Sequence, residues 1–361
     1  MGTPLFSPSV PDGAVSAAGS YRLQVAAVIE ETADARSLVL DVPPELRERF
    51  RYKPGQFLSF RVPCAGQMLT RCYSMASSPL CDPQPKVTIK RVAGGRVSNW
   101  MNTQVQVGDW LEVLPPAGHF CLAADSDEQR PLILFGGGSG ITPVFSILKS
   151  VLHAGRRPVT LVYANRDEAS VIFKDELQQL VRAHEPRLEV LHLLDSVQGF
   201  VTPAQVRQLL HARRGGEYFI CGPAPFMDTV ESTLLALGEP RQAIHVERFL
   251  SPADPQPQAR QAIEDTDTPS SRSLSVELDG QAHSLAWRPG QTLLQSCRAA
   301  GLQVPASCEE GICGACMCRV EQGRTRLAHN AVLSPQELAD GWTLACQSYP
   351  DAPAVRVRFP D

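Results

Sequence analysis

Four cysteines constrain this chain of 361 residues more than any other feature. Cys308, Cys313 and Cys316 follow the spacing C-x4-C-x2-C, and Cys346 lies further along the chain in the sequence LACQS. Four explanations for such closely spaced thiols are possible: a disulfide network, a zinc site, an iron–sulfur cluster, or a chance spacing without function. Each alternative requires a different protein around it, so the rest of the sequence has to discriminate between them.

A disulfide network is disfavoured first. The chain has 11 cysteines, an odd number, and residues 1–20 lack the basic and apolar regions of a secretory signal. No apolar run reaches the roughly 18 residues that a membrane-spanning helix needs. We therefore expect a cytoplasmic protein with reduced thiols and no transmembrane segment, preceded by a disordered tail at 1–20. A net charge of −4 gives no reason to expect a nucleic-acid partner.

The spacing of the four cysteines favours iron over zinc. A zinc ribbon pairs two short C-x2-4-C knuckles, and the second knuckle is missing here. A C-x4-C-x2-C run followed by a distant cysteine is typical of a plant-type [2Fe–2S] cluster. Gly311, Gly314 and Ala315 are small enough for the backbone to approach the cluster closely. A fifth cysteine, Cys318, lies just beyond this run, and we interpret it as a core or free thiol.

Changes in composition divide the chain into domains. The polar run 123–130 and the Pro-rich segment 251–273 separate three stretches of different pattern, and the second is interpreted as a linker. Residues 21–125 contain short β-rich runs, which predict an antiparallel β-barrel. Residues 130–250 alternate between strand and helix patterns, which predicts a parallel sheet flanked by helices. Residues 274–361 predict a compact α+β domain.

Short apolar runs and periodic segments predict individual elements. Alternation and β-branched residues indicate strands, and apolar residues at three- to four-residue intervals indicate helices. A turn is expected at Asp279-Gly280, and Gly301 is expected to end a helix. The clearest predicted strands are 56–62, 86–92, 109–114, 131–137, 158–164, 188–194, 217–222 and 354–359, and the predicted helices are 141–155, 173–184, 202–213, 226–238 and 291–301.

Two further stretches carry binding signals. The sequence GGGSGITP at 136–143 follows a strand and opens a helix, a context in which glycines let the backbone approach a pyrophosphate. The sequence CGPAPFM at 221–227 places Cys221 at the end of a strand, where ligands gather in open α/β sheets. Each could instead be an ordinary turn, but the first lies between a strand and a helix, which strengthens it.

The barrel region has its own pair of signals. Arg71 and Ser74 lie in the sequence RCYS, and a second Gly-Gly turn opens GGRVSNW at 94–100. An arginine and a serine in a barrel, next to a glycine turn, suit a flavin that carries phosphate. Either stretch alone could be an ordinary strand or turn.

Taken together, these residues resemble the ferredoxin–NADP reductase superfamily fused to a plant-type ferredoxin. The flavin motif, the nicotinamide motifs and the cluster motif occur in the family's order and cover residues 20–361. The chain looks similar to the reductase components of phenylacetyl-CoA oxygenases and of 3-ketosteroid 9α-hydroxylases. The resemblance implies a flavin barrel, a nucleotide domain and a β-grasp ferredoxin domain.

The resemblance also implies roles for single residues. Arg71 is expected at the flavin diphosphate, and Tyr73 and Ser74 at the isoalloxazine, with Ser74 near N5. Glu247 is expected near the hydride path, and Phe249 over the flavin, although here the linker continues beyond it. The other expected contacts are Gly95, Arg96, Val97 and Ser98 at the diphosphate, Gly137, Gly138, Gly140 and Thr142 at the nicotinamide cofactor, and Cys221 and Gly222 beside the nicotinamide ring.

The function implied is electron transfer from NAD(P)H through a flavin and the cluster to a partner oxygenase or hydroxylase. The flavin motifs resemble the FAD-using relatives more than the FMN-using ones. Arg166 could pair with the 2′-phosphate of NADPH, but Asp167 and Glu168 follow at once and oppose it, so NADH is the expected donor. A reductase of a hybrid-cluster protein or an acyl desaturase, and a redox sensor or carrier without turnover, are the alternatives.

Overall fold

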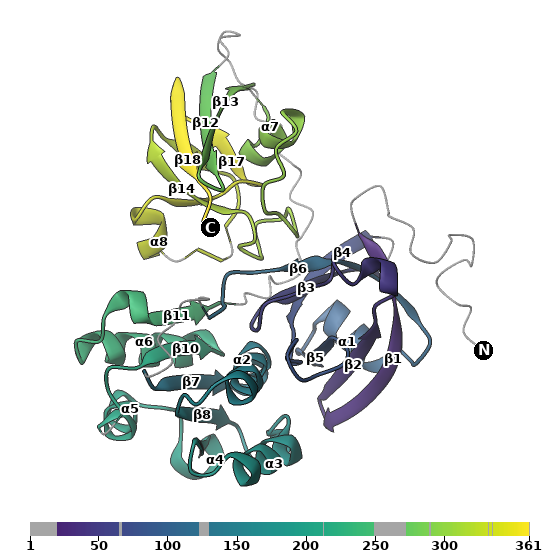
Figure 1. Ribbon diagram of the computed structural model, residues 1–361, viewed down its shortest axis with the longest axis vertical. Coiled ribbons are helices and arrows are strands. Elements are labelled where there is room, and N and C mark those ends of the chain that lie inside the picture. The colour runs from purple at the N-terminus through teal and green to yellow at the C-terminus, as the bar shows by residue number, and fades with distance from the viewer. Residues whose placement is uncertain are drawn as a thin grey trace. The chain divides into compact units, whose positions relative to one another are not determined.

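The structure, a computed structural model, describes residues 20–64, 67–122, 130–211, 213–248, 272–288, 290–330, 332–333 and 335–360. It divides into two compact units (Figure 1). Unit 1 comprises Met1–Pro116 and Phe120–Arg248, and unit 2 comprises Ala117–His119 and Phe249–Asp361. The predicted tail at 1–20 and the predicted linker at 251–273 lie almost wholly outside the described residues. The positions of the predicted domain boundaries stay predictions.

The first half of unit 1 is an antiparallel sheet of six strands in the order β4-β3-β6-β1-β2-β5. An isolated bridge between Met75 and Val87 joins the outer strands β4 and β5 and closes the sheet into a barrel. In β1 the residues Tyr21, Leu23 and Val25 are buried and alternate with more exposed ones, as a strand with one face on a core requires. The elements are β1 (Tyr21–Thr32), β2 (Ala35–Asp41), β3 (Phe57–Cys64), β4 (Gln67–Ser74), β5 (Lys86–Lys90), α1 (Arg96–Thr103) and β6 (Trp110–Ala117).

The second half of unit 1 is a parallel sheet of five strands in the order β11-β10-β7-β8-β9. Strand and helix alternate along the chain, which is the pattern that builds parallel sheets. The elements are β7 (Leu132–Gly137), α2 (Ile141–Ala154), β8 (Val159–Asn165), α3 (Lys174–His184), β9 (Leu188–Leu194), α4 (Asp195–Gln198), α5 (Pro203–Leu210), β10 (Glu217–Cys221), α6 (Ala224–Ala236) and β11 (Ile244–Glu247).

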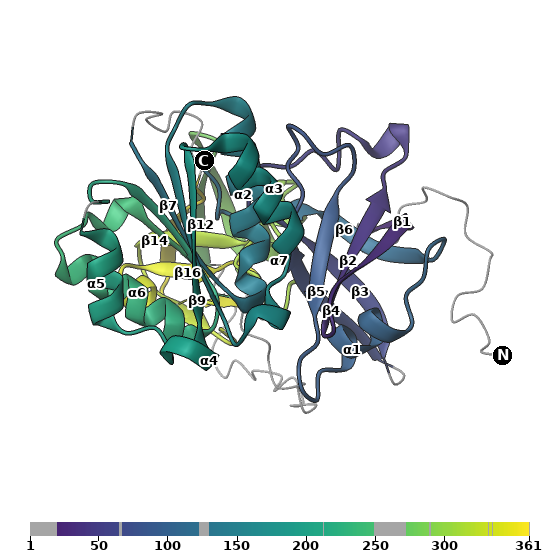
Figure 2. The same ribbon diagram turned by 90° about the horizontal axis from the view of Figure 1, so that it is seen from below.

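Helices cover both faces of this sheet. Leu132 and Leu134 of β7 pack with α2 and α3 on one face, and Ile133 and Phe135 pack with α5 and α6 on the other. A strand buried on both sides is apolar throughout, which is why β7 is an unbroken hydrophobic run. Figure 2 shows α2 and α3 on the side of the sheet that faces the barrel. Ala76 of the barrel belongs to the same core as these two helices, so the two halves of unit 1 pack directly together.

Unit 2 is a mixed sheet of five strands in the order β13-β12-β18-β14-β16, with a separate pair formed by β15 and β17. Trp287, Leu293 and Cys297 are fully buried in its core, so α7 packs against the sheet. The elements are β12 (Arg272–Leu278), β13 (Gln281–Trp287), α7 (Leu293–Ala299), β14 (Met317–Gln322), β15 (Thr325–Leu327), α8 (Pro335–Ala339), β16 (Trp342–Leu344), β17 (Ser348–Pro350) and β18 (Ala354–Arg358).

The predicted fold class is confirmed for all three parts. Asp279 and Gly280 both have positive φ, 51° and 70°, and form the two-residue turn between β12 and β13. Gly301 follows α7 with φ of 78°, the left-handed conformation that ends many helices. Helix α1 is among the elements that were not predicted: the stretch GGRVSNW is a turn only up to Gly95, after which α1 begins.

Candidate functional site

The predicted flavin motif lies on β4, an outer strand of the barrel. In the ladder with β3, Phe57 pairs with Ser74 and Phe60 with Arg71. Because successive side chains alternate between the faces of a strand, Arg71 and Tyr73 share one face and Ser74 lies on the other. Tyr73 packs edge-on against Phe60 with 5.9 Å between ring centroids, and burial raises the pKa of its hydroxyl. Strand β4 therefore presents the guanidinium of Arg71, the neutral phenol of Tyr73 and the buried hydroxyl of Ser74.

The second flavin signal forms the start of α1. Gly95 is extended, the helix begins at Arg96, and no side chain caps its first turn. A Cβ on Gly95 would lie 2.6 Å from Ser98 Oγ, so a side chain is not tolerated there without a shift. Ser98 Oγ accepts a hydrogen bond from Val92 N at 3.2 Å, which holds the turn against the barrel. A helix N-terminus without a side-chain cap fits the diphosphate that the motif predicts.

The glycine-rich turn after β7 packs against the segment after β10. A Cβ on Gly140 would lie 2.3 Å from the carbonyl oxygen of Cys221, and one on Gly222 would lie 2.9 Å from Gly137 Cα. These positions require glycine because the two backbones touch. The turn ends the central parallel strand and opens α2, whose first turn also lacks a side-chain cap. This arrangement fits a pyrophosphate at the carboxyl edge of the sheet.

Hydroxyl groups brace this turn, and a cation lies beside it. Thr142 Oγ1 donates to the carbonyl oxygen of Ser139 at 3.1 Å, and the Tyr163 hydroxyl donates to that of Gly138 at 3.1 Å. A Cβ on Gly138 would lie 3.9 Å from Lys90 Nζ, which reaches over from the barrel strand β5. Sequence reasoning missed Lys90, because a lysine at the end of a strand carries no motif.

Three residues far apart in the sequence meet where these segments converge. Cys221 and Glu247 are register partners at the ends of β10 and β11. Burial raises the pKa of the Glu247 carboxyl well above its usual range, and Ser74 beside it opposes the rise. Neither Ser74 Oγ nor Glu247 Oε2 has a hydrogen-bond partner of ordinary geometry among the described residues. Burial, and then the nearby Glu247, raise the pKa of Cys221 as well. Ser74 and Cys221 are buried and Glu247 is partly buried, so the three form a group of polar side chains with little access to water.

Two more polar residues at this edge escaped sequence reasoning. Asn165, at the end of β8, is buried, and neither its amide nitrogen nor its oxygen has a partner among the described residues. Such an unpaired buried amide is costly, and a bound ligand would relieve the cost. Burial, followed by the charge of Glu247, raises the pKa of Cys121 to about 12, which places this thiol beside the same group. Phe249, predicted over the flavin, lies outside the described residues.

The cluster loop of unit 2 runs from Ser307 to Cys316 and turns sharply. Glu309, Gly311 and Gly314 have φ of 58°, 75° and 70°. A Cβ on Gly311 would lie 2.9 Å from the carbonyl oxygen of His329, so this position has no room for a side chain. The positive φ values turn the loop sharply, and the absence of a side chain at Gly311 lets the loop pack directly against His329.

The four predicted ligand cysteines face one another as two pairs. Hydrogen bonding to the Cys313 sulfur raises the pKa of Cys308. A hydrogen bond between the second pair raises the pKa of Cys316 and lowers that of Cys346. Backbone N–H groups also approach sulfur: Cys308 N lies 3.5 Å from Cys313 Sγ, and Cys346 N lies 3.5 Å from Cys316 Sγ. Two thiol pairs with N–H groups directed at sulfur fit a two-iron cluster with four thiolate ligands.

The same residues do not form a single-ion site. No group of three or more His, Cys, Asp or Glu side chains in the described ranges has the geometry to hold one metal ion. Cys318 is fully buried on β14 within the core of unit 2, as its interpretation as a core thiol predicts.

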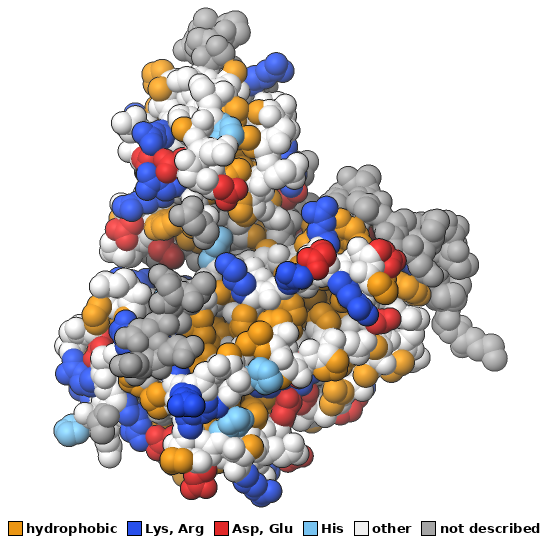
Figure 3. Space-filling model, in the orientation of Figure 1, with side chains coloured by type: hydrophobic (Ala, Val, Ile, Leu, Met, Phe, Trp, Pro, Cys, Tyr) orange, Lys and Arg blue, Asp and Glu red, His pale blue; other side chains and the backbone are white. Residues whose placement is uncertain are grey.

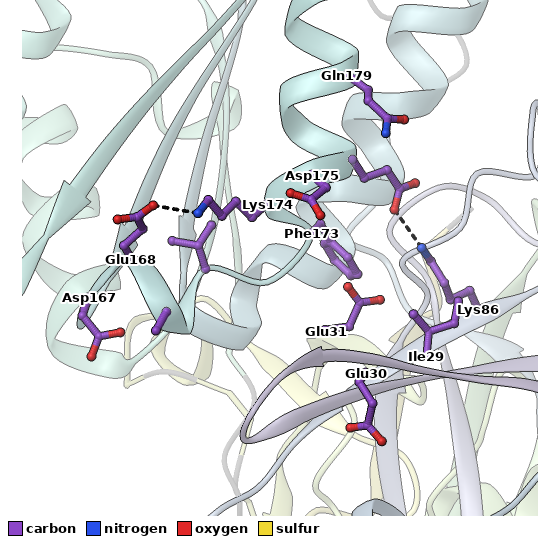
Figure 4. Close-up of a pocket in the computed structure, with 13 residues that line it drawn as sticks. Ile29, Glu30, Glu31, Lys86, Asp167, Glu168, Phe173, Lys174, Asp175 and Gln179 are labelled. Atoms are coloured by element: carbon purple, nitrogen blue, oxygen red, sulfur yellow. Dashed lines mark hydrogen bonds and ion pairs between the residues drawn. The ribbon is translucent and has the colours of Figure 1, made fainter.

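A large pocket of unit 1 lies apart from Ser74, Cys221 and Glu247. It has a volume of about 900 Å³ and opens between β1 and the segment that leads into α3 (Figure 4). Its lining is rich in carboxylates and includes Glu31 and Lys86 from the barrel and Asp167 and Lys174 from the nucleotide half. On the face shown in Figure 3, basic and acidic side chains are intermingled, without an extended patch of one sign.

Three family models match the chain in the predicted order. They are the oxidoreductase FAD-binding domain at residues 22–121, the oxidoreductase NAD-binding domain at 134–232, and the 2Fe-2S iron-sulfur cluster binding domain at 276–351. With the geometry above, they define an iron–sulfur flavoprotein that oxidises a nicotinamide cofactor. FAD, the nicotinamide cofactor and a [2Fe–2S] cluster are its cofactors.

Curated relatives extend over nearly the whole chain. The ferredoxin reductase component of 3-ketosteroid-9-alpha-monooxygenase from Rhodococcus rhodochrous is 46% identical over 343 residues, 94% of this chain and 97% of the relative. A component of the 1,2-phenylacetyl-CoA epoxidase of Escherichia coli (strain K12) is 33% identical, and the match covers 94% of this chain and 97% of the relative. The chain belongs to this family of oxygenase reductase components.

A solved structure shows the same architecture. Phthalate dioxygenase reductase, described as a modular structure for electron transfer from pyridine nucleotides to [2Fe-2S], has a TM-score of 0.58 with this chain at 24% identity. The match covers 95% of this chain and 98% of that one. At this identity the likeness supports the fold.

Proposed function

We propose that this chain oxidises NADH and delivers electrons one at a time to an oxygenase component. The observation that carries the proposal is the convergence of Ser74, Cys221 and Glu247 beside the glycine-rich turn, within one compact unit. When bound, the nicotinamide supplies a hydride, the flavin accepts the electron pair and releases single electrons, and the cluster carries them onward. The residues of the chain bind these groups, orient them and exclude water.

At the flavin, Arg71 and the first turn of α1 would hold the diphosphate. The guanidinium supplies charge, and the first-turn N–H groups at Arg96, Val97 and Ser98 supply donors. Tyr73 would lie against the isoalloxazine. Its ring packs against Phe60, so it would offer the flavin a rigid surface. Gly95 leaves the backbone accessible at the start of the helix.

At the nicotinamide cofactor, the backbone of the turn would hold the pyrophosphate. Gly137, Gly138 and Gly140 permit the close approach, and Thr142 fixes the turn. Lys90 adds a positive charge from the barrel side. These contacts together join the two halves of unit 1 around one ligand.

Ser74, Cys221 and Glu247 would line the space where the two rings meet. Burial raises the pKa of Cys221 above its usual value, so this thiol keeps its proton at neutral pH, and burial shifts the Glu247 carboxyl towards its neutral form. With Ser74 they offer hydrogen-bonding groups beside the proposed ring site, in a place with little access to water. Gly222 leaves room beside Cys221.

NADH is the proposed donor rather than NADPH. Arg166 Nε lies 2.9 Å from Asp167 Oδ2, so the cation that could bind a 2′-phosphate already has a partner. The hydrogen bond from Arg166 also holds the pKa of Asp167 below its usual range, which keeps that carboxylate charged. Glu168 adds a second carboxylate. A phosphate placed here would have to compete with Asp167 for Arg166 and with Glu168 for Lys174.

In unit 2, Cys308, Cys313, Cys316 and Cys346 would ligate the cluster. The relatives named above are components of oxygenase systems, and this supports an oxygenase component as the acceptor. No helix within the described residues is long and apolar enough to cross a membrane. The odd number of cysteines, 11 in all, supports a reducing compartment such as the cytoplasm.

The proposal is tested by mixing the anaerobic, cofactor-loaded protein with NADH. Loss of flavin absorbance should be followed by the EPR signal of a reduced [2Fe–2S] centre. Addition of an oxygenase component of the 3-ketosteroid 9α-hydroxylating kind should then re-oxidise the protein. A protein that binds NADH without losing flavin absorbance contradicts the proposed donor, and one that stays reduced with every oxygenase component tested contradicts the proposed acceptor.

A further inference from the structure

Helix α2 connects the two cofactor regions of unit 1. It begins at Ile141, directly after the glycine-rich turn, and is buried along most of its length. In its middle, between Thr142 of the first turn and His153 of the last, three buried polar residues interrupt the apolar surface: Ser146, Lys149 and Ser150. Residues three and four positions apart lie on the same face of a helix, so these side chains form one stripe. At 1.5 Å per residue, the stripe ends about 13 Å from the start of the helix.

The two serines bind the segment that follows the flavin motif. Ser146 Oγ donates to the carbonyl oxygen of Ser77 at 2.5 Å, and Ser150 Oγ donates to that of Ser146 at 2.7 Å. A hydroxyl has one proton, so Ser78 Oγ is the donor in its 2.7 Å hydrogen bond with Ser150 Oγ. All four serines are buried. The helix is thereby bonded to residues just beyond Ser74.

Lys149 adds a charged contact to the same segment. Its Nζ lies 2.6 Å from Asp82 Oδ2 and 3.2 Å from Glu176 Oε1, and its side chain is 5% exposed. Glu176 Oε2 in turn lies 3.0 Å from Lys86 Nζ (Figure 4). Asp82 and Lys86 belong to the barrel, whereas Lys149 and Glu176 belong to the nucleotide half. The four charges alternate in sign across the interface, which offsets the cost of burying Lys149.

Aromatic rings complete the contact. Phe145 of α2 stacks on Phe173 with 4.5 Å between ring centroids. Lys149 Nζ lies 4.8 Å from the centroid of Phe145, and Lys86 Nζ lies 4.9 Å from that of Phe173. A cation from each half of unit 1 therefore lies over a pair of stacked rings. The interface has directional contacts, so it resists sliding more than an apolar surface would.

We propose that Ser146, Lys149 and Ser150 are positioning residues that set the approach of the nicotinamide to the flavin. The glycine turn at the start of α2 holds one cofactor, and the stripe fixes this helix to the segment behind Ser74, which lines the other. Hydride transfer needs the reacting atoms in close alignment, and a misplacement of about 1 Å can cost about 100-fold in rate. The inference rests on the proposed hydride-transfer site. It adds that α2 sets the distance between the two cofactors.

The test compares three substitutions in the full-length, cofactor-loaded protein. Lys149→Met keeps the bulk of the side chain and removes the charge, Lys149→Arg keeps the charge, and Lys174→Met is the matched control. Lys174 forms an exposed ion pair with Glu168 at 2.6 Å on the nucleotide half alone. Anaerobic stopped-flow measurement gives the rate constant of flavin reduction and the Kd for NADH. Hydrogen exchange of the oxidised protein reports on segments 75–82 and 141–154.

The expected result is a split between rate and affinity. Lys149→Met should lower the rate constant by about tenfold or more, since geometry is lost without loss of binding contacts. Flavin content and the Kd for NADH should remain those of the wild type. Hydrogen exchange should rise in both segments together. Lys149→Arg should recover most of the rate, and Lys174→Met should change neither quantity.

Two results overturn the inference. The first is an unchanged rate constant in Lys149→Met, whether or not hydrogen exchange rises. The second is an equal fall in rate constant for Lys149→Met and Lys174→Met. If Lys149→Met does not fold, Ser150→Ala is judged by the same criteria, because it removes only one hydroxyl. A wild-type protein that binds NADH without flavin reduction contradicts the proposed function instead, and so the two failures are distinguishable.

Discussion

The cluster loop and the nicotinamide–flavin site are built in opposite ways. Three of the four cluster ligands lie within nine residues, and sharp turns at Gly311 and Gly314 bring their sulfurs together. The nicotinamide–flavin site draws Ser74, the glycine turn and Glu247 from strands of two different sheets. A local site depends on spacing in one loop, whereas a distributed site depends on the interface that holds its parts. The two should therefore fail in different ways when single residues are changed.

The largest effect is expected for the local site. Cys346→Ser removes one of four cluster ligands and should abolish or strongly alter the rhombic EPR signal of the reduced protein. Reduction of ferricyanide by NADH should persist, because it requires only unit 1. Cys318→Ala is the matched control, since Cys318 is buried in the same core of unit 2 but is not one of the four predicted ligands, and it should keep the signal. An unchanged signal in Cys346→Ser, or zinc in the purified protein, contradicts the ligand assignment.

The next effect is expected in the distributed site. Gly140→Ala places a methyl group 2.3 Å from the carbonyl oxygen of Cys221 and must separate the turn from the end of β10. The kcat/KM for NADH should fall by about 100-fold, as expected for a displacement near 1 Å. Ser139→Ala, in the exposed part of the same turn, should have little effect. Equal activity of the two variants would mean that the close approach of the backbones is unimportant.

A third prediction concerns the amino-terminal edge of the parallel sheet, opposite the edge proposed to bind the cofactors. At the start of β10, Glu217 pairs with Arg157 at 2.8 Å and with His245 at 3.2 Å. Burial raises the pKa of Glu217, but the hydrogen bonds from His245 and Arg157 outweigh it, so the pKa lies below its usual 4.5. Stability from this group is therefore present above about pH 4.5 and is lost as the pH falls through the lowered value.

The substitution Glu217→Gln leaves Arg157 buried without its charged partner. It should lower the free energy of unfolding at neutral pH by about 3 kcal/mol, and the deficit should shrink as the pH falls below the usual range of a carboxyl. Urea unfolding at a series of pH values measures this. Hydride transfer per folded molecule should not change. A deficit that is independent of pH would show that Glu217 contributes through packing and not through charge.

The smallest effect is expected for cofactor choice. Asp167→Asn removes one carboxylate and releases Arg166, so the ratio of kcat/KM for NADPH over NADH should rise by about five- to tenfold, as one unit charge in water is worth about 1 kcal/mol. Asp175→Asn, an exposed carboxylate in the first turn of α3, should leave the ratio unchanged. A wild-type protein that prefers NADPH would refute the assignment of the donor.

The parts of both sites that lie close together in the chain could be predicted from the sequence. The cysteine spacing indicated the ligand set, and the glycine turn between a strand and a helix indicated the pyrophosphate site, because both depend on residues close together in the chain. The strand–helix alternation predicted the parallel sheet for the same reason. Asp279-Gly280 could be predicted to form a turn, since few residue pairs accept two positive φ values.

The interface within unit 1 could not be predicted in this way. Ser146, Lys149 and Asp82 are common residue types, and what matters is which distant residue each one meets. The one available signal was a lysine and two serines in the mostly apolar middle of a helix. Asn165 and Lys90 were missed for the same reason. Polar pairing across an interface is a property of the fold, and it leaves little trace in local spacing.

The central claim is that hydride chemistry resides in unit 1 and that the cluster of unit 2 is the outlet for single electrons. Its most direct test is a fragment that ends after Pro252, within the predicted linker. The account predicts a soluble yellow protein that reduces ferricyanide with NADH at the full-length rate and fails to support the oxygenase component. A fragment that loses its flavin, or one that drives the oxygenase at the full-length rate, would contradict it.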